Sequence, residues 1–162
     1  MGNNPVEFKS DKVGQDCRRF PIETVSWDDA QDFVRRLKAK EGGSRFRLAT
    51  ETEWNMLRKA DIFKYSGSDN PETVAWYYDN SGGRTHKVGT KQPNGFELYD
   101  MSGNVWEWVQ DRYDENAYRK LSSKDPVNSN SGFNRVHRGG SWNHNADNLR
   151  SANRYNFSLN YR

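Results

Sequence analysis

Residues 95–108 read GFELYDMSGNVWEW and hold the clearest strand signal of the chain. The turn formers at 102–104 come first. Trp106 and Trp108 then alternate with valine and glutamate. Because successive side chains of a strand point to opposite faces of a sheet, this alternation predicts a strand over residues 104–109 that leaves a tight turn.

A first helix is predicted ahead of this strand, from Ser26 to about Lys40. Ser26 and Asp29 have the spacing of a helix cap, and apolar residues that include Phe33 recur with helical period. Gly42 follows the last periodic residue, as is typical of a helix end. These signals predict an amphipathic helix with one apolar stripe.

A second helix is predicted to begin at Thr50, where TETE resembles a capping box. We expect this helix to bury Trp54 and Leu57. Glu51 and Glu53 could also form a pair of catalytic carboxylates, although the chemistry of a helix start explains both of them. The sequence leaves these two interpretations open.

Short apolar pieces between turn residues follow the second helix and predict a small sheet with long loops. The expected strands are residues 85–88, 104–109 and 135–138. Two helices followed by such a sheet indicate an α+β fold. With 162 residues, the chain has the length of one domain, which we place over residues 1–162.

The composition excludes several classes of function. Cys17 is the single cysteine, so an internal disulfide and a thiolate metal cage are excluded. The chain has no run of 18 apolar residues and no signal-peptide pattern at residues 1–5, so we predict no direct membrane insertion. The 25 basic and 22 acidic residues are interleaved, which favours a mixed surface over a nucleic-acid interface.

The composition changes near the C-terminus. Nine of the 17 asparagines lie in residues 125–162, and no lysine follows Lys124. Residues 143–162 contain no Lys, Glu, Gln, Met or Trp. A flexible polar loop could explain this bias, but Tyr155, Phe157, Leu159 and Tyr161 alternate and are too hydrophobic for a linker.

Four blocks of the chain are similar, in order and spacing, to the signature blocks of a known family. They read FPIETVSWDDA at 20–30, FRLATETEW at 46–54, GFELYDMSGNVWEW at 95–108 and RVHRGGSW at 135–142. The chain thus resembles the formylglycine-generating-enzyme, or sulfatase-modifying factor, domain. This resemblance implies a C-type lectin-like fold with a small twisted antiparallel sheet. It also implies that the family's first and last strands are missing, which predicts an unpaired sheet edge and a fragment of a longer protein.

The best-known activity of that family oxidises a substrate cysteine to formylglycine, through a copper-binding pair of cysteines after the RGGS block. Here residues 143–154 read NHNADNLRSANR, and Cys17 lies far upstream, so the copper site cannot form. A three-histidine iron site, known from other relatives, is not matched, because His86, His137 and His144 lack local metal-cage spacing. We therefore predict that the chain is not an enzyme, with a formylglycine-generating-type oxidase as the alternative.

The C-terminal segment resembles the variable ligand-binding proteins of diversity-generating retroelements, whose codons are mutagenised at adenines. RGGSW at 138–142 followed by RSANR at 150–154 fits their pattern. Adenine substitutions in an asparagine codon cannot produce the five residue types that are absent from residue 143 onward. The resemblance predicts that residues 143–162 form a variable ligand-binding segment. A catalytically silent family member with an Asn-rich loop is the alternative.

The residue types of this segment suit recognition, because Tyr and Phe offer rigid contact area while Asn, Ser and His adapt their hydrogen bonds. The expected partner is a protein or glycan, and Arg150 and Arg154 are expected to belong to the scaffold. A cell-surface or secreted location in a bacterium or phage would suit this role. The predicted binding residues are Asn143, His144, Asn145, Asp147, Asn153, Tyr155, Phe157, Ser158 and Tyr161.

The family resemblance also implies a structural calcium ion, held by oxygen ligands around the GNVWEW stretch. The ligands would be the side chains of Asp100 and Glu107 and the backbone carbonyls of Gly103 and Val105. Alternatively, Asp100 forms a turn and Glu107 belongs to a surface pair. No other cofactor is expected.

Overall fold

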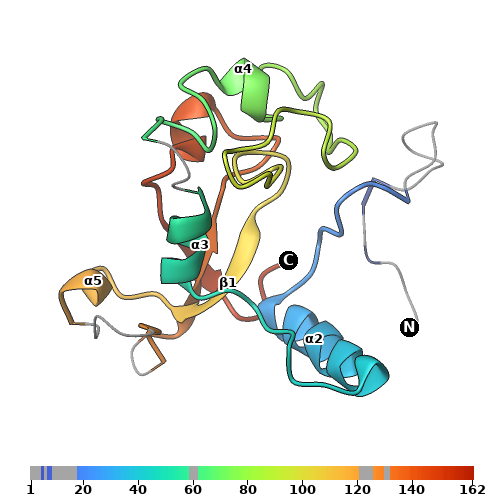
Figure 1. The fold of residues 1–162 in the computed structure, drawn as a ribbon, viewed down its shortest axis with the longest axis vertical. Coiled ribbons are helices and arrows are strands. Elements are labelled where there is room, and N and C mark those ends of the chain that lie inside the picture. The colour runs from blue at the N-terminus through green and yellow to red at the C-terminus, as the bar shows by residue number, and fades with distance from the viewer. Residues whose placement is uncertain (1–4, 6, 9–17, 59–61, 121–125, 130–131) are drawn as a thin grey trace.

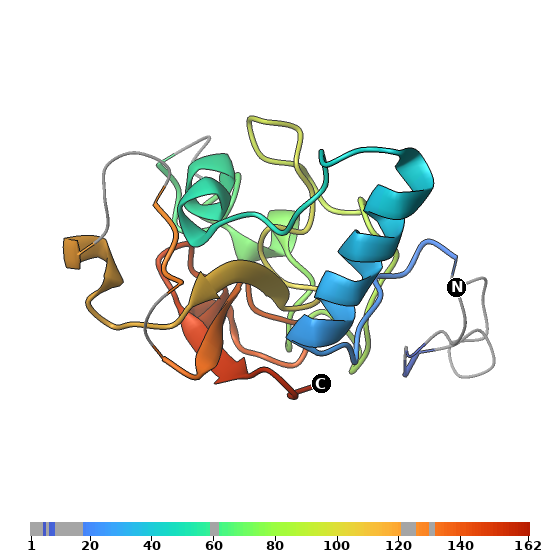
Figure 2. The same cartoon turned by 90° about the horizontal axis from the view of Figure 1, so that it is seen from below.

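The computed structural model describes residues 5, 7–8, 18–58, 62–120, 126–129 and 132–162. Long loops connect its short elements, and α2 lies at one edge of the molecule (Figures 1 and 2). Two main helices with a small antiparallel sheet confirm the predicted α+β class. In chain order the elements are α2 (Trp27–Glu41), α3 (Glu51–Arg58), α4 (Pro71–Val74), β1 (Glu107–Arg112), α5 (Ala117–Lys120), β2 (Asn134–Arg138), the 3-10 helix η1 (Ala146–Leu149) and β3 (Tyr155–Ser158).

The cap predicted for α2 is confirmed. The Ser26 hydroxyl accepts a hydrogen bond from the backbone N–H of Asp29 at 3.1 Å, and the Asp29 carboxylate accepts one from the backbone N–H of Ser26 at 2.9 Å. Gly42 ends the helix with a φ of 67°, a conformation that glycine adopts without steric cost. Both ends of α2 are therefore set by local sequence.

The apolar stripe of α2 is only partly covered by the described part of the chain. No residue of α2 is buried, and Phe33 keeps 53% of its surface exposed. The helix is attached at its first turn, where the indole N–H of Trp27 donates to the carbonyl of Val109 at 3.0 Å. Helical period in the sequence thus indicated the helix correctly but did not indicate burial.

The start of α3 is also capped as predicted. The backbone N–H of Thr50 donates to Glu53 at 2.8 Å, and the backbone N–H of Glu53 donates to the Thr50 hydroxyl at 3.2 Å. The guanidinium of Arg47 and these capping bonds lower the pKa of Glu53 to about 2. Glu53 therefore serves the helix start.

The buried face of α3 differs from the predicted one. Glu51, Trp54 and Arg58 are its buried residues, whereas Leu57 is 38% exposed. The buried positions are spaced by three and four residues, which places them on one side of the helix, and Leu57 falls on another side. The predicted burial of Trp54 is correct, and that of Leu57 is wrong because two charged residues occupy the face that packs inward.

The sheet has the order β1-β2-β3, and both pairs are antiparallel. The predicted strand at 135–138 is confirmed as β2. The strand predicted at 104–109 begins at Glu107 and continues to Arg112. It starts late because the backbone N–H groups of Gly103 and Asn104 donate to Gly139 and Trp76, outside the β1–β2 ladder.

Residues 85–88 do not form a strand, contrary to the prediction. The backbone N–H of His86 donates to the Asn104 side chain at 3.0 Å, and that of Val88 donates to the Arg19 carbonyl at 2.8 Å. A side-chain acceptor replaces the regular ladder of a strand. The segment is therefore an extended loop packed against the 95–108 region.

The core consists of two small clusters of buried residues. One contains Tyr65, Val74, Ala75, Tyr77 and Leu149, and the other contains Trp54, Met101, Val109 and Val136. At Gly103, with a φ of 83°, an added Cβ would lie 2.4 Å from the Trp76 carbonyl oxygen. Only glycine fits there, so the loop before β1 packs directly against the backbone next to the first cluster.

Candidate functional site

One side of the sheet carries a group of aromatic side chains that comes from separate parts of the chain. The register pairs Trp108 with His137 and His137 with Tyr155, which places these three side chains on the same sheet face. Phe157 stands two residues further along β3 and shares this face. We define the aromatic face as Trp106, Trp108, His137, Tyr155, Phe157 and Tyr161.

The rings of the aromatic face contact one another in a continuous series. The Trp106 ring centroid lies 4.8 Å from that of Tyr155, and the His137 centroid lies 4.8 Å from that of Phe157. Phe157 and Tyr161 are stacked, with centroids 4.0 Å apart and an interplanar angle of 10°. Three predicted binding residues, Tyr155, Phe157 and Tyr161, are thus brought together in one surface.

His144 lies beside this face. Its ring meets Trp106 edge to face, with centroids 5.2 Å apart, and its Nδ1 lies 2.9 Å from the hydroxyl oxygen of Ser141. The Ser141 hydroxyl also donates to the Asn143 side chain at 2.6 Å. The segment that enters the predicted variable region is therefore fixed by the serine of the RGGSW block.

The other predicted polar residues make mostly local contacts. The amide of Asn148 donates to Asn145 at 2.6 Å, and the amide of Asn153 donates to the carbonyl of Asp147 at 2.5 Å. Asn145, Asp147 and Ser158 are exposed, as is Asn143, whereas Asn153 is half-buried. Asn145, Asp147 and Asn153 lie in or beside η1, and Ser158 ends β3. η1 meets the aromatic face where the Tyr155 hydroxyl donates to the side-chain oxygen of Asn148.

Sequence reasoning missed three members of the face. Trp106 and Trp108 read as scaffold, and His137 read as an ordinary strand residue, because each lies outside the Asn-rich segment. The alternation of Trp106 and Trp108 was a usable signal, since it placed both on one side of the predicted strand. The position of β3 beside β2 was needed to show that this side faces the C-terminal aromatics.

The aromatic face is uncharged at its centre. Burial lowers the pKa of His137 to about 3, and its Nδ1 has no hydrogen-bond partner among the described residues. Burial also lowers the pKa of His144. Both rings are therefore neutral at pH 7, and the face offers apolar and aromatic contacts with polar groups at its edge.

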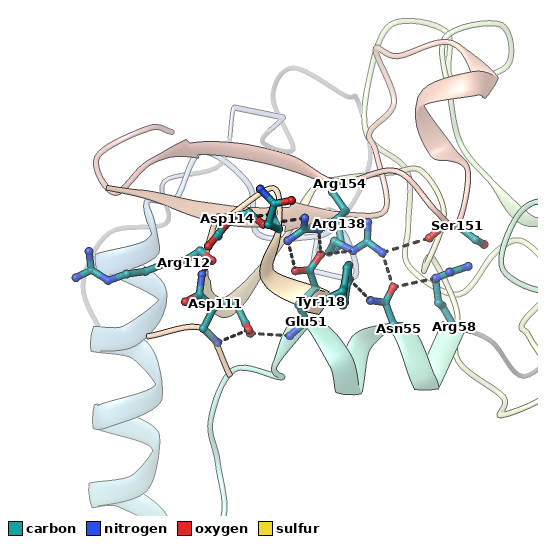
Figure 3. Close-up of polar contacts among 12 residues, drawn as sticks. Glu51, Asn55, Arg58, Asp111, Arg112, Asp114, Tyr118, Arg138, Ser151 and Arg154 are labelled. Carbon is teal, nitrogen blue, oxygen red and sulfur yellow. Dashed lines mark hydrogen bonds and ion pairs between the residues drawn. The ribbon is translucent and has the colours of Figure 1, made fainter. Parts of the chain in front are cut away.

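A buried ion cluster supports β3 from the opposite side of the sheet (Figure 3). Arg154, directly before β3, donates to both carboxylate oxygens of Glu51 at 2.7 Å. Arg138 Nε lies 3.5 Å from the same carboxylate, and its side chain is 1% exposed. Glu51 is thus a counter-ion for two arginines, which explains it without a catalytic role. It also places Arg154 away from solvent, whereas Arg150 is exposed.

Comparison with known proteins now identifies the domain. Residues 1–161 match the model of the sulfatase-modifying factor enzyme 1-like domain. The chain belongs to this family. The sulfatase-modifying factor enzyme 1-like match confirms the first resemblance seen in the sequence, and with it the C-type lectin-like α+β fold.

Three relatives show how the family varies. The structure superposes on Treponema denticola variable protein 1 with a TM-score of 0.85 and 31% identity, over 100% of this chain and 74% of that one. Chaperone protein LppX of Paenibacillus barcinonensis is 29% identical, over 67% of this chain and 55% of its own. Formylglycine-generating enzyme of Streptomyces coelicolor is 29% identical, over 85% and 46%. The chain spans about half the length of these two curated relatives.

The likeness to a variable protein supports the second resemblance as well. The names of the relatives differ in function, so membership in the sulfatase-modifying factor enzyme 1-like family does not assign an activity to this chain. In this domain the segment after RGGSW contains no cysteine. Cys17 lies outside the described residues.

The candidate calcium residues of the domain lie partly together. Asp100, Val105 and Glu107 line one pocket of about 510 Å³. Burial raises the pKa of Glu107 to about 7, the Trp54 indole N–H opposes this effect, and the Asp100 charge adds to it. Burial also raises the pKa of Asp100. Within the described residues no cluster of three or more His, Cys, Asp or Glu side chains could hold a metal ion, so carbonyl oxygens would have to complete this site.

Among the described residues, no helix is long and apolar enough to cross a membrane.

Proposed function

We propose that this protein is a non-enzymatic ligand-binding protein, and that the aromatic face binds a protein or glycan. The observation that carries the proposal is the meeting of Tyr155, Phe157 and Tyr161 with Trp106 and the His137 ring in one continuous surface. Large aromatic side chains give much contact area at little cost in conformational entropy. Asparagine and histidine at the edge supply hydrogen bonds that can adapt to a partner.

We further propose that residues 143–162 are diversified, as in the variable proteins that the C-terminal segment resembles. The backbone of β3 is held by its pairing with β2, which does not depend on side-chain identity. Arg154 and Ser151 attach the segment before it, through Glu51 and through the carbonyl of Lys64 at 2.9 Å. The exposed side chains of residues 143–162 other than these anchors could change at a cost in folding stability of about 0.5 kcal/mol or less each.

A ligand for the aromatic face can be sought by screening. We suggest screening the protein against a glycan array and against a displayed peptide library, and then repeating each positive with the triple variant Tyr155→Ala, Phe157→Ala, Tyr161→Ala. Binding should be lost in the triple variant. The matched control is Tyr78→Ala with Phe96→Ala, which removes exposed rings outside the aromatic face. Ligands that bind the triple variant as well as the wild type would contradict the assignment of the face.

The diversification has its own test at the level of DNA. We expect a near-identical repeat of the codons for residues 143–162 beside the gene, differing at adenines, and a neighbouring reverse transcriptase gene. A neighbourhood without both would remove the diversification proposal. It would leave the binding proposal and the family membership unchanged.

We also propose that Asp100 and Glu107 hold a calcium ion, together with the carbonyl oxygens of Gly103 and Val105. Burial raises the pKa of both carboxylates, the Asp100 charge adds to the effect at Glu107, and both line one pocket, so a divalent cation is a suitable partner for them. The ion would neutralise their repulsion and fix the loop that leads into β1. Its role in this proposal is structural.

A further inference from the structure

A second pocket lies outside the aromatic face and is rich in basic residues. Its volume is about 610 Å³, and none of the residues of the aromatic face lines it. We call it the basic pocket, and the residues that matter for its chemistry are Arg58, Lys64, Asp69, Arg150 and Ser151. They come from the end of α3, from the loop after residue 61 and from the segment between η1 and β3.

Arg58 is the unusual member of this pocket. It is the last residue of α3 and is 8% exposed, yet no carboxylate of the described chain lies within ion-pair distance of its guanidinium. Within the described residues, its guanidinium makes one hydrogen bond, from Nε to the side-chain oxygen of Asn55 at 3.3 Å. Buried charges in proteins are normally paired, because removing a charge from water without a partner is costly.

The surroundings of Arg58 increase this imbalance. The same Asn55 oxygen also accepts a hydrogen bond from Arg138, so two guanidinium groups share one neutral acceptor (Figure 3). The carboxylate of Glu51 is engaged by Arg138 and Arg154 and does not extend to Arg58. Burial and the Arg138 charge lower the pKa of Arg58 to about 10, which leaves it charged at pH 7.

A second carboxylate of the cluster, that of Asp111, is also occupied. Asp111 accepts hydrogen bonds from the backbone N–H groups of Glu51 and Asn128, at 2.7 Å and 2.8 Å. The described part of the cluster therefore contains three guanidinium groups, of Arg58, Arg138 and Arg154, against the carboxylates of Glu51 and Asp111. Among these three, Arg58 has no ion pair with a carboxylate of the described residues, and it is the one that lines the basic pocket.

The remaining wall of the basic pocket adds donors. Asp69, the acidic residue of the wall, accepts a hydrogen bond from the backbone N–H of Lys64 at 2.7 Å. The side chain of Arg150 is exposed and has no hydrogen-bond or ion-pair partner among the described residues. Ser151 is 6% exposed, and its hydroxyl has no hydrogen-bond partner in the described structure. Within the described residues, the Ser151 hydroxyl has no hydrogen-bond partner and the Arg58 guanidinium has no ion pair, and both line the same pocket. Both can therefore donate to a bound acceptor.

We propose that the basic pocket binds an oxyanion, a carboxylate, sulfate or phosphate group of a ligand, with Arg58 as its principal contact. Arg58 would supply its two terminal NH2 groups, since Nε–H bonds to Asn55, and the Ser151 hydroxyl would donate a further hydrogen bond. Arg150 would add charge at the entrance, as would Lys64, whose ammonium nitrogen lies 3.4 Å from the Asp147 carboxylate. This site is independent of the aromatic face, so it stands whether or not that face binds a ligand.

The proposal is tested by titrating the full chain with sodium sulfate, phosphate and acetate, each against chloride at equal ionic strength. The side-chain Nε–H signal of Arg58 is followed by NMR. We expect a saturable shift with at least one of the three anions and none with chloride. Sulfate and phosphate report tetrahedral oxyanions, and acetate reports a carboxylate, so the three titrations also identify the anion class.

Variants separate this site from general charge attraction. Arg58→Gln and Arg150→Gln should each weaken binding, Arg58→Gln by about tenfold or more, as expected for a lost charge-assisted hydrogen bond. Their binding is followed by the backbone N–H signal of Ser151. Arg45→Gln is the matched control, because it removes the same charge from an exposed residue outside the pocket. The proposal is overturned if no anion gives a saturable shift, or if all three variants bind equally. If Arg58→Gln does not fold, the exposed Arg150→Gln decides the matter.

Discussion

Arg154 donates two hydrogen bonds to Glu51, from Nε and Nη2 at 2.7 Å each, across 103 residues of sequence. Glu51 begins α3, and Arg154 directly precedes β3. The pair therefore connects an early helix to the strand that carries the C-terminal aromatics. Two hydrogen bonds of this kind fix distance and orientation together.

Removing the carboxylate charge of Glu51 should destabilise the protein strongly. In Glu51→Gln, Arg138 and Arg154 lose their shared counter-ion while both remain largely buried. We expect the free energy of unfolding to fall by about 3–5 kcal/mol, measured by urea denaturation. The control is Glu53→Gln on the same helix, whose ion pair with Arg47 is exposed to solvent and should be worth about 1 kcal/mol or less. Similar losses for both variants would contradict the buried-pair interpretation.

The stability of the protein should depend on pH through His137. Its pKa in the folded state is about 3, below the value of about 6.5 in an unfolded chain. The unfolded state therefore binds the proton first, and protonation lowers stability as the pH falls from 6.5 toward 3, by about 1.4 kcal/mol per pH unit. His137→Phe keeps an aromatic ring against Trp108 and removes the titrating group. Denaturation curves at pH 7, 6 and 5 should diverge between wild type and variant, and parallel pH dependence would refute this.

Calcium should bind at the Asp100 and Glu107 pocket and stabilise the fold. Isothermal titration calorimetry should detect one site in the wild type, and the thermal midpoint should rise with calcium concentration. Glu107→Gln should abolish both effects because it removes one of two carboxylate ligands. Glu97→Gln serves as the control, since Glu97 is exposed in the same region of the chain and does not line the pocket. An unchanged calcium response in Glu107→Gln would rule out this site.

A copper-dependent oxidation of a cysteine peptide is not expected. The segment after RGGSW places histidine, asparagine and serine where the thiolate chemistry would need cysteines. We predict no formylglycine product by mass spectrometry when the protein is incubated with copper(I), oxygen and a cysteine-containing peptide. An active formylglycine-generating enzyme run in parallel is the positive control. Product above the copper-only background would favour the oxidase alternative.

Local signals predicted the two main helices, because the Ser26 and Thr50 caps depend on residues three positions apart. Strand β2 was also predicted from local sequence, as a short apolar piece between turn residues. The region at 85–88 failed because its backbone donors meet Asn104 and Arg19, and no local pattern encodes a partner so far along the chain. Residue types alone could not distinguish a free extended loop from a strand.

The candidate site was only partly predictable for the same reason. The aromatic residues of β3 stood out by composition. Their neighbour Trp106 directly precedes β1, and their neighbour His137 lies in β2. The buried role of Glu51 was also hidden, since its partner lies 103 residues away. Arg58 reads as an ordinary basic residue at a helix end, and its unpaired state becomes visible only with the cluster around it.

The stack of Tyr161 on Phe157, itself in contact with His137, has a consequence for how this surface could evolve. A substitution at position 157 changes the support under position 161, so the effects of the two positions on binding should not add. Selection for a new ligand would then act on pairs of residues. A repertoire built on this surface would contain fewer independent solutions than its number of variable codons suggests, and its members would differ in the shape of the stack as well as in its chemistry.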